Sequence, residues 1–314
     1  MRFAPPDRVA LSCSDVHVTK GVVLALLAYA AYAWGDAAMK ALGGTLSVFE
    51  IGFYQMLIAG SLLLLTRPDG HGWLDFWRMR FPLAVQVRAI VGFVGAVLSV
   101  YAFTTIPLAE VYAIVFLSPL FVTIISMIFL REQIGPWRWS AVVMGFLGVL
   151  LVVRPGFREL ELGHAAALGM ALLNALSVTL NRSLAERERT TTILGYIVFY
   201  GLVFNGLAMA ATGATRVPDW HSVALLLAIG GLTAAGQMLM LRAARFAPAN
   251  HIAPTHYSQI GWAVLLGALF FQETPDAWAL VGIAVIAASG LLTMARERIR
   301  LGTVRWNRFA RPRL

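Results

Sequence analysis

Residues 95–137 read GAVLSVYAFTTIPLAEVYAIVFLSPLFVTIISMIFLREQIGPW, and residues 236–278 read GQMLMLRAARFAPANHIAPTHYSQIGWAVLLGALFFQETPDAW. Laid over each other without a gap, at an offset of 141, the two stretches agree at widely spaced positions. These are Gly95 and Gly236, Leu98 and Leu239, Pro107 and Pro248, Phe129 and Phe270, Glu132 and Glu273, and Trp137 and Trp278.

The duplication extends to the start of each half. An offset of 142 places Gly21 on Gly163 and Lys40 on Arg182. Internal repeats of this kind are typical of membrane transporters. The alternative is that two apolar helices resemble each other by composition alone.

Composition indicates a membrane protein with several spans. Hydrophobic residues make up 59% of the chain and charged residues 13%, whereas a soluble domain carries about 25% charged residues. The first apolar run, 21–42, is too long for a signal peptide. The single cysteine, Cys13, cannot form an intrachain disulfide, and no Cys/His cluster has metal-ligand spacing. We therefore expect no metal and no cofactor.

Ten apolar segments have the length of about 20 residues that crosses a hydrocarbon core of about 30 Å. They lie near 21–42, 48–66, 86–105, 107–130, 136–153, 163–184, 191–212, 221–243, 249–271 and 277–295. The connection 67–85 contains Trp73, Phe76 and Trp77, which fits either a short helix at the membrane interface or a plain polar loop.

Basic residues set the orientation. With the N-terminus in the cytoplasm, 21 Lys and Arg residues lie inside, and only Lys40, Arg154, Arg158 and Arg216 lie outside. This asymmetry predicts that both termini are cytoplasmic and that the number of spans is even. The net charge of +9 is explained by orientation, so we expect no nucleic acid as a partner.

The predicted fold class is an all-α membrane protein with ten transmembrane helices in two inverted five-helix repeats. Each repeat has an odd number of spans, so the second enters from the opposite side of the bilayer. The expected divisions are a cytoplasmic N-terminal segment 1–20, a first repeat 21–156, a second repeat 163–297, and a basic cytoplasmic tail 298–314.

Several motifs carry a resemblance to a known family. The run 145–156 (GFLGVLLVVRPG) and the stretch 119–137, with Arg131 and Glu132 before its turn, resemble the first repeat of the EamA family, which belongs to the drug/metabolite transporter superfamily. The run 272–276 (QETPD), followed by 281–283 (VGI), resembles the end of its second repeat. The resemblance covers about residues 20–297 and implies ten helices and transport of small metabolites.

Within this family, the pattern 35–40 (GDAAMK) followed by Phe49 and Glu50 resembles members that take up S-adenosylmethionine. The chain departs from that pattern at three positions. Gln55 stands where many relatives have arginine, and His256 and Gln259 stand where the most similar ones tend to have arginine and glutamate. Substrate identity therefore does not carry over.

The segments 107–130 and 249–271 are the candidates for the transport pathway. Ser118 and Gln259 are repeat-related and lie about 16 Å deep, at 1.5 Å per residue, which is the middle of the membrane. Pro119 and Pro254 are expected to interrupt the two helices and to support a gate. The expected substrate-binding set is Ser118, His256, Tyr257, Gln259, Trp262, Asp36, Tyr101 and Trp34. For the polar members, hydrogen bonding between helices is the alternative.

Charged residues at the outer ends of the spans have two interpretations. Lys40, Glu50 and Glu110 could form an acidic outer vestibule with Asp36, which lies four residues before Lys40 and close enough to pair with it. Alternatively, the carboxylates of Glu50 and Glu110 suit helix N-termini and need no substrate. Glu132 and Glu273, each near a tryptophan, are interpreted as structural, supporting a gate.

The function that these features predict is secondary transport of a small polar or amphiphilic organic metabolite across the inner membrane by alternating access. The expected partners are that substrate and the lipid bilayer, and protons are left open as a further partner, which Asp36 or His256 could bind. Substrates left open are an S-adenosylmethionine-like cation, an amino acid, or an exported drug or metabolite. A membrane-embedded enzyme and a passive channel are the alternatives, but the chain has no HExxH, GxSxG or phosphate-loop motif, and no ring of like charges.

Overall fold

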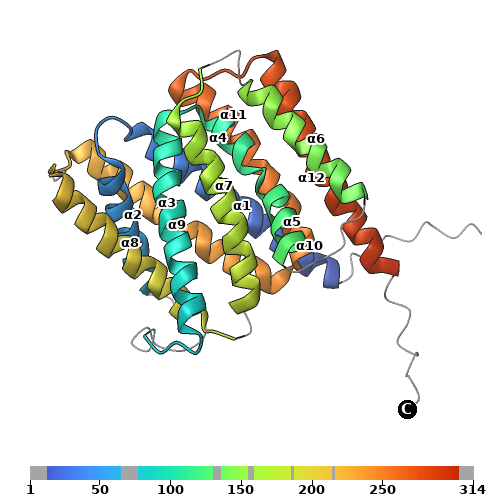
Figure 1. The fold of residues 1–314 in the computed structure, drawn as a ribbon, viewed down its shortest axis with the longest axis horizontal. Helices are drawn as coiled ribbons and strands as arrows, with labels where there is room; N and C mark the ends of the chain where they lie inside the picture. Colours follow the sequence, from blue (N-terminus) through green and yellow to red (C-terminus); the bar gives the residue numbers. More distant parts are fainter. Residues whose placement is uncertain are drawn as a thin grey trace, which may run out of the picture.

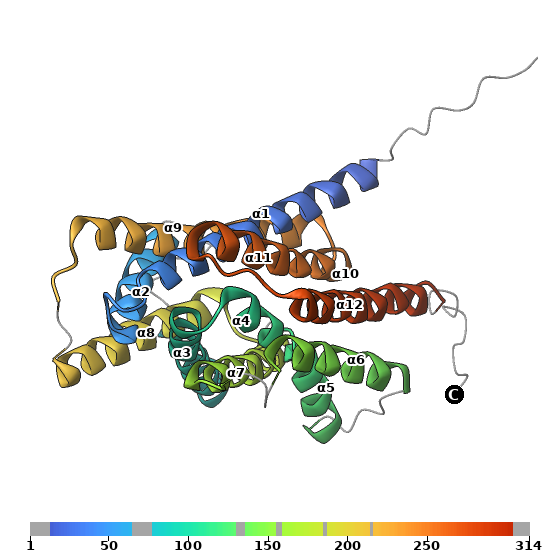
Figure 2. The ribbon, with the colours of Figure 1, turned by 90° about the horizontal axis from the view of Figure 1, so that it is seen from above.

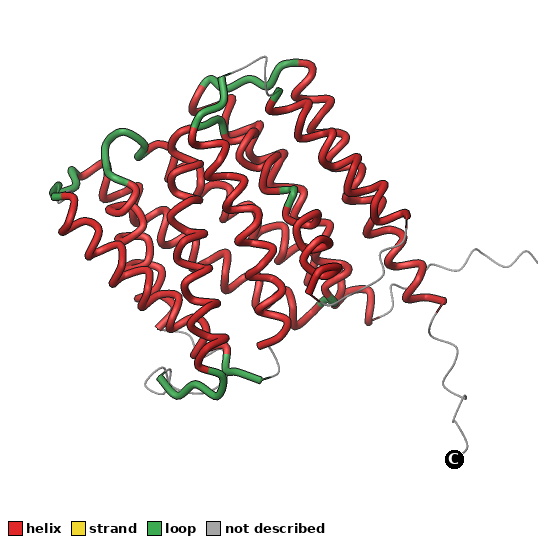
Figure 3. Tube along the Cα trace, viewed as in Figure 1, coloured by secondary structure: helices red, strands yellow, loops and turns green. Residues whose placement is uncertain are grey.

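The computed structural model describes residues 13–64, 77–129, 136–154, 159–184, 187–213 and 216–303. Within these residues the regular structure is helical, apart from an isolated bridge between Gly43 and Leu46. The helices run side by side, and the connections that can be seen lie mostly at the two ends of the bundle (Figure 3).

The helices follow the predicted order. The first half contains α1 (Cys13–Ala41), α2 (Val48–Leu64), α3 (Pro82–Thr105), α4 (Leu108–Val115), α5 (Ser118–Phe129) and α6 (Pro136–Val153). The second half contains α7 (Leu162–Leu184), α8 (Thr190–Thr212), α9 (Trp220–Phe246), α10 (Ala249–Ile252), the 3-10 helix η2 (Ala253–Tyr257), α11 (Ser258–Phe271) and α12 (Ala277–Thr303). The segments 107–130 and 249–271, in which Pro119 and Pro254 predict an interruption, are each broken in the structure.

Local signals explain where several helices begin and end. The N–H of Ser47 donates to the Glu50 carboxylate at 2.7 Å, and the N–H of Glu50 donates to the Ser47 hydroxyl at 3.2 Å. This reciprocal pair is a capping box at the start of α2. Asp219 caps α9 by accepting from the N–H of Ser222 at 3.1 Å. Gly213 ends α8 in the left-handed conformation, φ 64°, which glycine adopts without strain.

The surface of the bundle suits a bilayer. Among the residues that the structure describes, six helical segments are long and apolar enough to cross a membrane: Val18–Ala41, Pro82–Thr105, Leu108–Ile125, Leu162–Asn181, Thr190–Thr212 and Trp220–Phe246. Three shorter apolar helices accompany them: Val48–Leu64, Trp139–Val153 and Ala277–Leu292. Large apolar side chains such as Leu207 and Leu269 are exposed, 60% and 65%, while alanines fill much of the core. The protein is therefore a multi-pass membrane protein.

Two layers of helices enclose a buried centre. Seen from above, α1, α9 and α11 lie along one side, and α3, α7 and α5 lie along the other (Figure 2). All eight residues of α4 are buried. The pairs α2 with α8 and α6 with α12 lie at opposite ends of the bundle (Figure 1).

Both of these end pairs are antiparallel. A methyl group on Gly52 of α2 would lie 3.0 Å from Asn205 Oδ1, and one on Gly60 would lie 2.6 Å from Val198 Cγ1. As α2 advances, its contacts therefore move back along α8. In the other pair, a methyl group on Gly145 would contact Ser289, and one on Gly148 would contact Ile286 and the Gly282 carbonyl. The contacts again move back along α12 as α6 advances.

The connection 67–85 lies largely outside the described residues, Trp73 and Phe76 among them. From Trp77 onward the chain is a turn and irregular backbone until α3 begins at Pro82. Trp77 is 57% exposed and packs edge-on against Phe199, with ring centroids 6.2 Å apart.

Candidate functional site

Two broken helices meet at the centre of the bundle. The first break lies at Phe116 and Leu117, between α4 and α5, and the second is η2, between α10 and α11. Pro119 is the second residue of α5, and Pro254 is the second residue of η2. Because proline lacks an N–H and restricts the residue before it, both positions are compatible with an interruption. The predicted interruptions near these two prolines are confirmed.

A column of aromatic rings joins the two breaks. His256 stacks on Tyr29 of α1, with centroids 4.8 Å apart and planes at 23°. His256 also packs on Phe116, at 4.8 Å and 44°. Phe116 in turn stacks on Tyr257, at 4.7 Å and 16°. The column therefore runs from α1 through the break of one repeat to the break of the other.

Tyr257 is wedged against α12. A methyl group on Gly290 would lie 1.6 Å from the Tyr257 hydroxyl oxygen. No side chain larger than hydrogen fits at Gly290 unless this tyrosine moves, so α12 fixes one end of the aromatic column.

A chain of polar groups lies beside the column. The Tyr112 hydroxyl donates to the Asp36 carboxylate at 2.5 Å, and Gln259 Nε2 donates to the Tyr112 hydroxyl oxygen at 3.3 Å. Tyr112 and Gln259 are buried, and Asp36 is partly buried. These bonds connect α1, α4 and α11, so Asp36 and Gln259, both predicted as site residues, belong to one network.

Ser118, by contrast, forms hydrogen bonds that join two helices. Its hydroxyl donates to the carbonyls of Val115 at 2.7 Å and Ala171 at 3.1 Å, and Asn174 Nδ2 donates to its oxygen at 3.4 Å. These bonds tie the start of α5 to α7. Ser118 and Gln259 are thus bonded to different helices, although the repeat relates them.

The remaining predicted aromatic residues lie nearer the surface. Trp34 is 42% exposed and packs against Trp262 at 6.4 Å and Phe270 at 5.9 Å. Tyr101 is partly buried against the main hydrophobic cluster. In this structure none of these three tryptophan and tyrosine rings is part of the stacked column.

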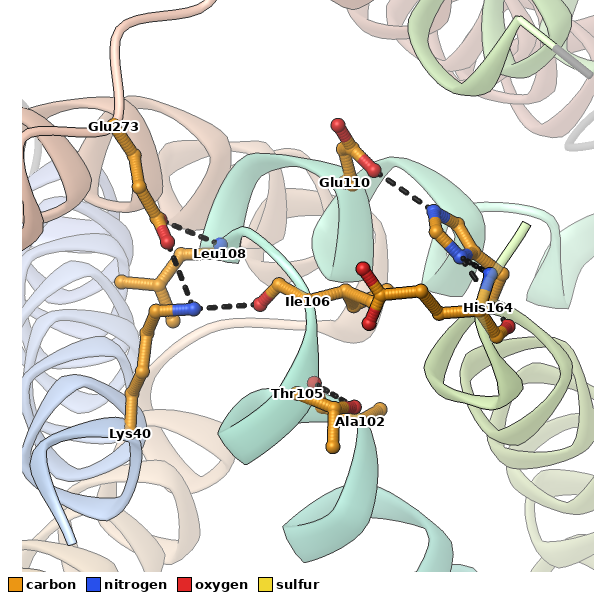
Figure 4. Close-up of polar contacts among 9 residues, drawn as sticks. Lys40, Ala102, Thr105, Ile106, Leu108, Glu110, His164 and Glu273 are labelled. Atoms are coloured by element: carbon orange, nitrogen blue, oxygen red, sulfur yellow. Dashed lines mark hydrogen bonds and ion pairs between the residues drawn. The ribbon is translucent and has the colours of Figure 1, made fainter. Parts of the chain in front are cut away.

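Lys40 and Glu273 tie helix ends together, as Figure 4 shows. Lys40 Nζ lies 2.8 Å from Glu273 Oε1 and donates to the Ile106 carbonyl at 2.7 Å. The other Glu273 oxygen accepts from the N–H of Leu108, the first residue of α4, at 3.1 Å. The expected pairing of Lys40 with Asp36 is therefore wrong, because the ammonium group of Lys40 is bound by Glu273 and by the Ile106 carbonyl instead.

Glu110 and Glu50 both have partners in the protein. His164 Nε2 lies 2.9 Å from Glu110 Oε2, linking α4 to the start of α7 (Figure 4). Glu50, besides its role at the start of α2, accepts from the N–H of Arg216 at 2.8 Å. The geometry at Glu50 agrees with the interpretation that its carboxylate stabilises the N-terminus of a helix. Glu132 lies outside the described residues.

Four residues of the site were not predicted from the sequence: Tyr29, Tyr112, Phe116 and His164. The repeat offers a signal for one of them, since the offset of 141 places Phe116 on Tyr257. Within the described residues, no group of three His, Cys, Asp or Glu side chains is placed to hold a metal ion.

Comparison with protein families gives a match to the EamA-like transporter family, over residues 19–154 and again over 161–295. The family model thus matches once in each half of the chain.

Curated relatives are transporters of different molecules. The chain is 32% identical to a riboflavin transporter of Rhizobium johnstonii over 226 residues, 71% of this chain and 74% of the relative. It is 30% identical to a pseudopaline exporter of Pseudomonas aeruginosa, covering 86% and 94% of the two chains. It is 25% identical to an S-adenosylmethionine uptake transporter of Rickettsia felis, covering 88% and 93%.

A solved crystal structure has the same overall fold. Its TM-score is 0.63 at 18% sequence identity, and the match covers 91% of this chain and 98% of the other.

Proposed function

The chain belongs to the EamA-like transporter family, and from that premise we propose that it is a ten-span secondary carrier working by alternating access. The protein is a membrane transporter of small molecules, like its curated relatives. The proposal adds the number of spans, the inversion of the repeats and the manner of transport.

The antiparallel end pairs support inversion. Helices α2 and α8 are the second helices of their repeats, and α6 and α12 are the last. A two-fold axis perpendicular to the membrane would make such related helices parallel, whereas an axis in the membrane plane makes them antiparallel, as their glycine contacts require. Ten spans result when the broken helices α4–α5 and α10–α11 are each counted once.

Orientation follows from the basic residues. We place both termini in the cytoplasm of a cell whose inner membrane holds the protein. The ends tied together by Lys40 and Glu273, and by Glu110 and His164, then lie on the outer side. In the proposed orientation, these two contacts hold the outer ends of the carrier closed.

The chemistry of the site suits a small molecule with both polar and aromatic groups. Stacked rings suit a flat apolar surface, and the polar chain of Asp36, Tyr112 and Gln259 supplies hydrogen-bonding groups beside it. We propose that His256, Tyr257, Gln259 and Asp36 contact the substrate, together with Tyr29 and Phe116. The observation that carries this proposal is the meeting of both broken helices in one aromatic column. Trp34, Trp262 and Tyr101 keep a place in the proposal only as parts of the pathway away from the column, and Ser118 only through its bonds between α5 and α7.

Reconstituted vesicles test the proposal. Purified protein in proteoliposomes is expected to exchange a radiolabelled panel of riboflavin, S-adenosylmethionine and amino acids, with at least one flux that saturates and is inhibited by unlabelled compound. A channel would give flux that does not saturate over the same range, and an enzyme would convert the compound. Empty vesicles and a Gly290→Leu variant, in which the column cannot form as observed, are the controls. Absence of saturable flux for every compound in a broad metabolite panel would refute the proposal.

A further inference from the structure

Asp36 is a carboxylate inside the bundle with a single neutral partner. Its one hydrogen bond among the described residues comes from the Tyr112 hydroxyl. Its neighbours Gly35 and Ala37 are buried, but Asp36 keeps some accessible surface. Asp36 is therefore a partly buried carboxylate within a membrane-crossing helix.

Such a group is incomplete by itself. An ionised carboxylate has about four sites that accept hydrogen bonds, and Tyr112 fills one of them. In hydrocarbon, an ionised side chain needs an opposite charge or must take up a proton. The described part of the chain supplies Asp36 with neither a lysine nor an arginine nor a histidine within ion-pair distance.

The nearest charged side chains are bound elsewhere. Lys40, one turn further along α1, is held by Glu273 and Ile106. On α4, Glu110 lies against His164. Neither of these pairs reaches Asp36.

Helices packed on α1 bring other titratable groups, but at a distance. On α9, Arg242 and Arg245 lie level with Gly21, which packs against Ala243 and Ala247. Gly21 is about 22 Å along α1 from Asp36, at 1.5 Å per residue. On the same scale, His221 lies about 16 Å along α9 from Leu232, the residue that packs on Gly35.

The other neighbouring elements also leave Asp36 without a cation. On α3, Arg88 donates to Asn181 of α7 at 2.8 Å, and Tyr101 is uncharged. On η2, His256 lies between the rings of Tyr29 and Phe116. His251 lies on α10, five residues before His256, and α11 has no charged side chain.

Two aromatic side chains lie about one and two turns away on the same helix. Tyr29 and Tyr32 precede Asp36 on α1, and both keep accessible surface. Aromatic faces attract cations as well as flat rings. Ser258, which follows the column in sequence, has a buried hydroxyl without a hydrogen-bond partner among the described residues.

We propose that Asp36 binds the positively charged group of an organic cation that carries a flat ring, and that it takes a proton from the aqueous phase when the cation leaves. This inference rests on the proposed function and names the substrate class of the same site. The ring lies against Tyr29 and His256, and the cationic group replaces the missing partner of the carboxylate.

Carbodiimide labelling tests the exchange without knowledge of the natural substrate. Dicyclohexylcarbodiimide reacts with protonated carboxyl groups in apolar surroundings, and mass spectrometry of peptides locates the adduct. The full-length protein in proteoliposomes is labelled across a range of pH, alone or with tryptamine, which is an ammonium on an indole. Tryptophol, with a hydroxyl in place of the ammonium, is the matched uncharged probe.

We expect labelling at Asp36 in the wild type and none at that position in Asp36→Asn. At a tryptamine concentration about ten times its dissociation constant, labelling should fall about tenfold by mass action, and tryptophol should leave it unchanged. Tyr112→Phe removes the one hydrogen bond to the carboxylate, so labelling should persist to higher pH. Tyr200→Phe, which removes a hydroxyl bonded to Gln86 elsewhere, should behave as wild type.

Several outcomes overturn the proposal. One is an absence of labelling at Asp36 at every pH. Another is labelling that tryptamine, S-adenosylmethionine and other ring-bearing cations fail to suppress. Equal suppression by tryptophol would assign the site to the ring alone. These results concern binding, so they are separate from a failure of the proposed function, which would appear as a lack of saturable flux in wild-type vesicles.

Discussion

Phe116 and Tyr257 stack on each other with ring centroids 4.7 Å apart, and they are the same position of the two repeats, 141 residues apart. When a two-fold rotation exchanges two residues, the midpoint between them lies on the axis. In the proposed inverted arrangement, this stacked pair therefore marks the axis, where the two broken helices meet.

A second set of contacts obeys the same relation. A methyl group on Gly21 would lie 2.4 Å from Ala247 Cβ, and one on Gly163 would lie 2.6 Å from Ile106 Cγ2. The offsets of 142 and 141 convert the first contact into the second. Each repeat thus packs its first helix against the end of the third helix of the other repeat.

The stacked pair should show a measurable coupling. Phe116→Leu and Tyr257→Leu each remove one ring, and the double variant removes both. A double-mutant cycle on unfolding in mild detergent should give an interaction free energy of about 0.5–1.5 kcal/mol, as for other aromatic pairs. Tyr257→Phe keeps the ring and should keep the coupling. Additive effects of the two single changes would mean that the stack contributes nothing specific.

Close packing between α6 and α12 gives a stability prediction. A methyl group on Gly148 would come within 2.9 Å of the Gly282 carbonyl oxygen, whereas one on Gly231 would have nothing within 4 Å. Gly148→Val should destabilise the protein by about 1–3 kcal/mol through overpacking, seen as a lower thermal midpoint by scanning fluorimetry. Gly231→Ala is the matched control and should leave the midpoint near that of wild type. Equal effects at both glycines would contradict the close approach of the two helices.

The proposed orientation can be tested with single cysteines. In a chain with Cys13 replaced by serine, cysteine at Thr45 or at Val217, which is 94% exposed, should react with an impermeant maleimide added outside the inner membrane. Cysteine at Arg78 should react only after the membrane is opened, because the charge distribution places it inside. Labelling of the Arg78 position from outside would require a different number of spans between it and Thr45.

Much of the fold could be predicted because the relevant signals are local. Apolar length sets the helices, and the structure gives α6 as Pro136–Val153 where the sequence predicted 136–153. Prolines predicted the two interruptions. Counting residues along the segment predicts how deep Ser118 lies in the membrane, but not which neighbouring helix its side chain faces. Its hydroxyl is bonded to the Ala171 carbonyl of α7.

The partners of charged residues could not be predicted in this way. Helical spacing suggested that Lys40 would pair with Asp36, four residues away, but its partner Glu273 lies in the other repeat. Such a contact depends on how the two halves pack, and the spacing of residues along one helix gives no information about that packing. The alignment of the two repeats does give some, since it relates Phe116 to Tyr257, which contact each other.

The Lys40–Glu273 pair leads to the last prediction, which concerns the outer closure. Glu273 holds the ammonium of Lys40 and caps the N–H of Leu108, and Leu108 is only 1% exposed. Glu273→Gln keeps the shape and an acceptor for the N–H, but it removes the charge. Loss of one partner leaves a partly buried ammonium uncompensated, so the outward-closed form should lose stability relative to the open form. A cysteine at Leu108 should then react faster with an impermeant thiol reagent in the Glu273→Gln background than with wild-type glutamate.

Lys40→Gln should have the same effect, and the double change Lys40→Gln with Glu273→Gln should restore much of the slow rate because no charge is left unpaired. Asp276→Asn is the matched control, since it removes the nearby ion pair with Arg154 without touching Lys40. Equal rates in all four backgrounds would show that the pair serves only to fold the helix ends and does not hold the outer side closed.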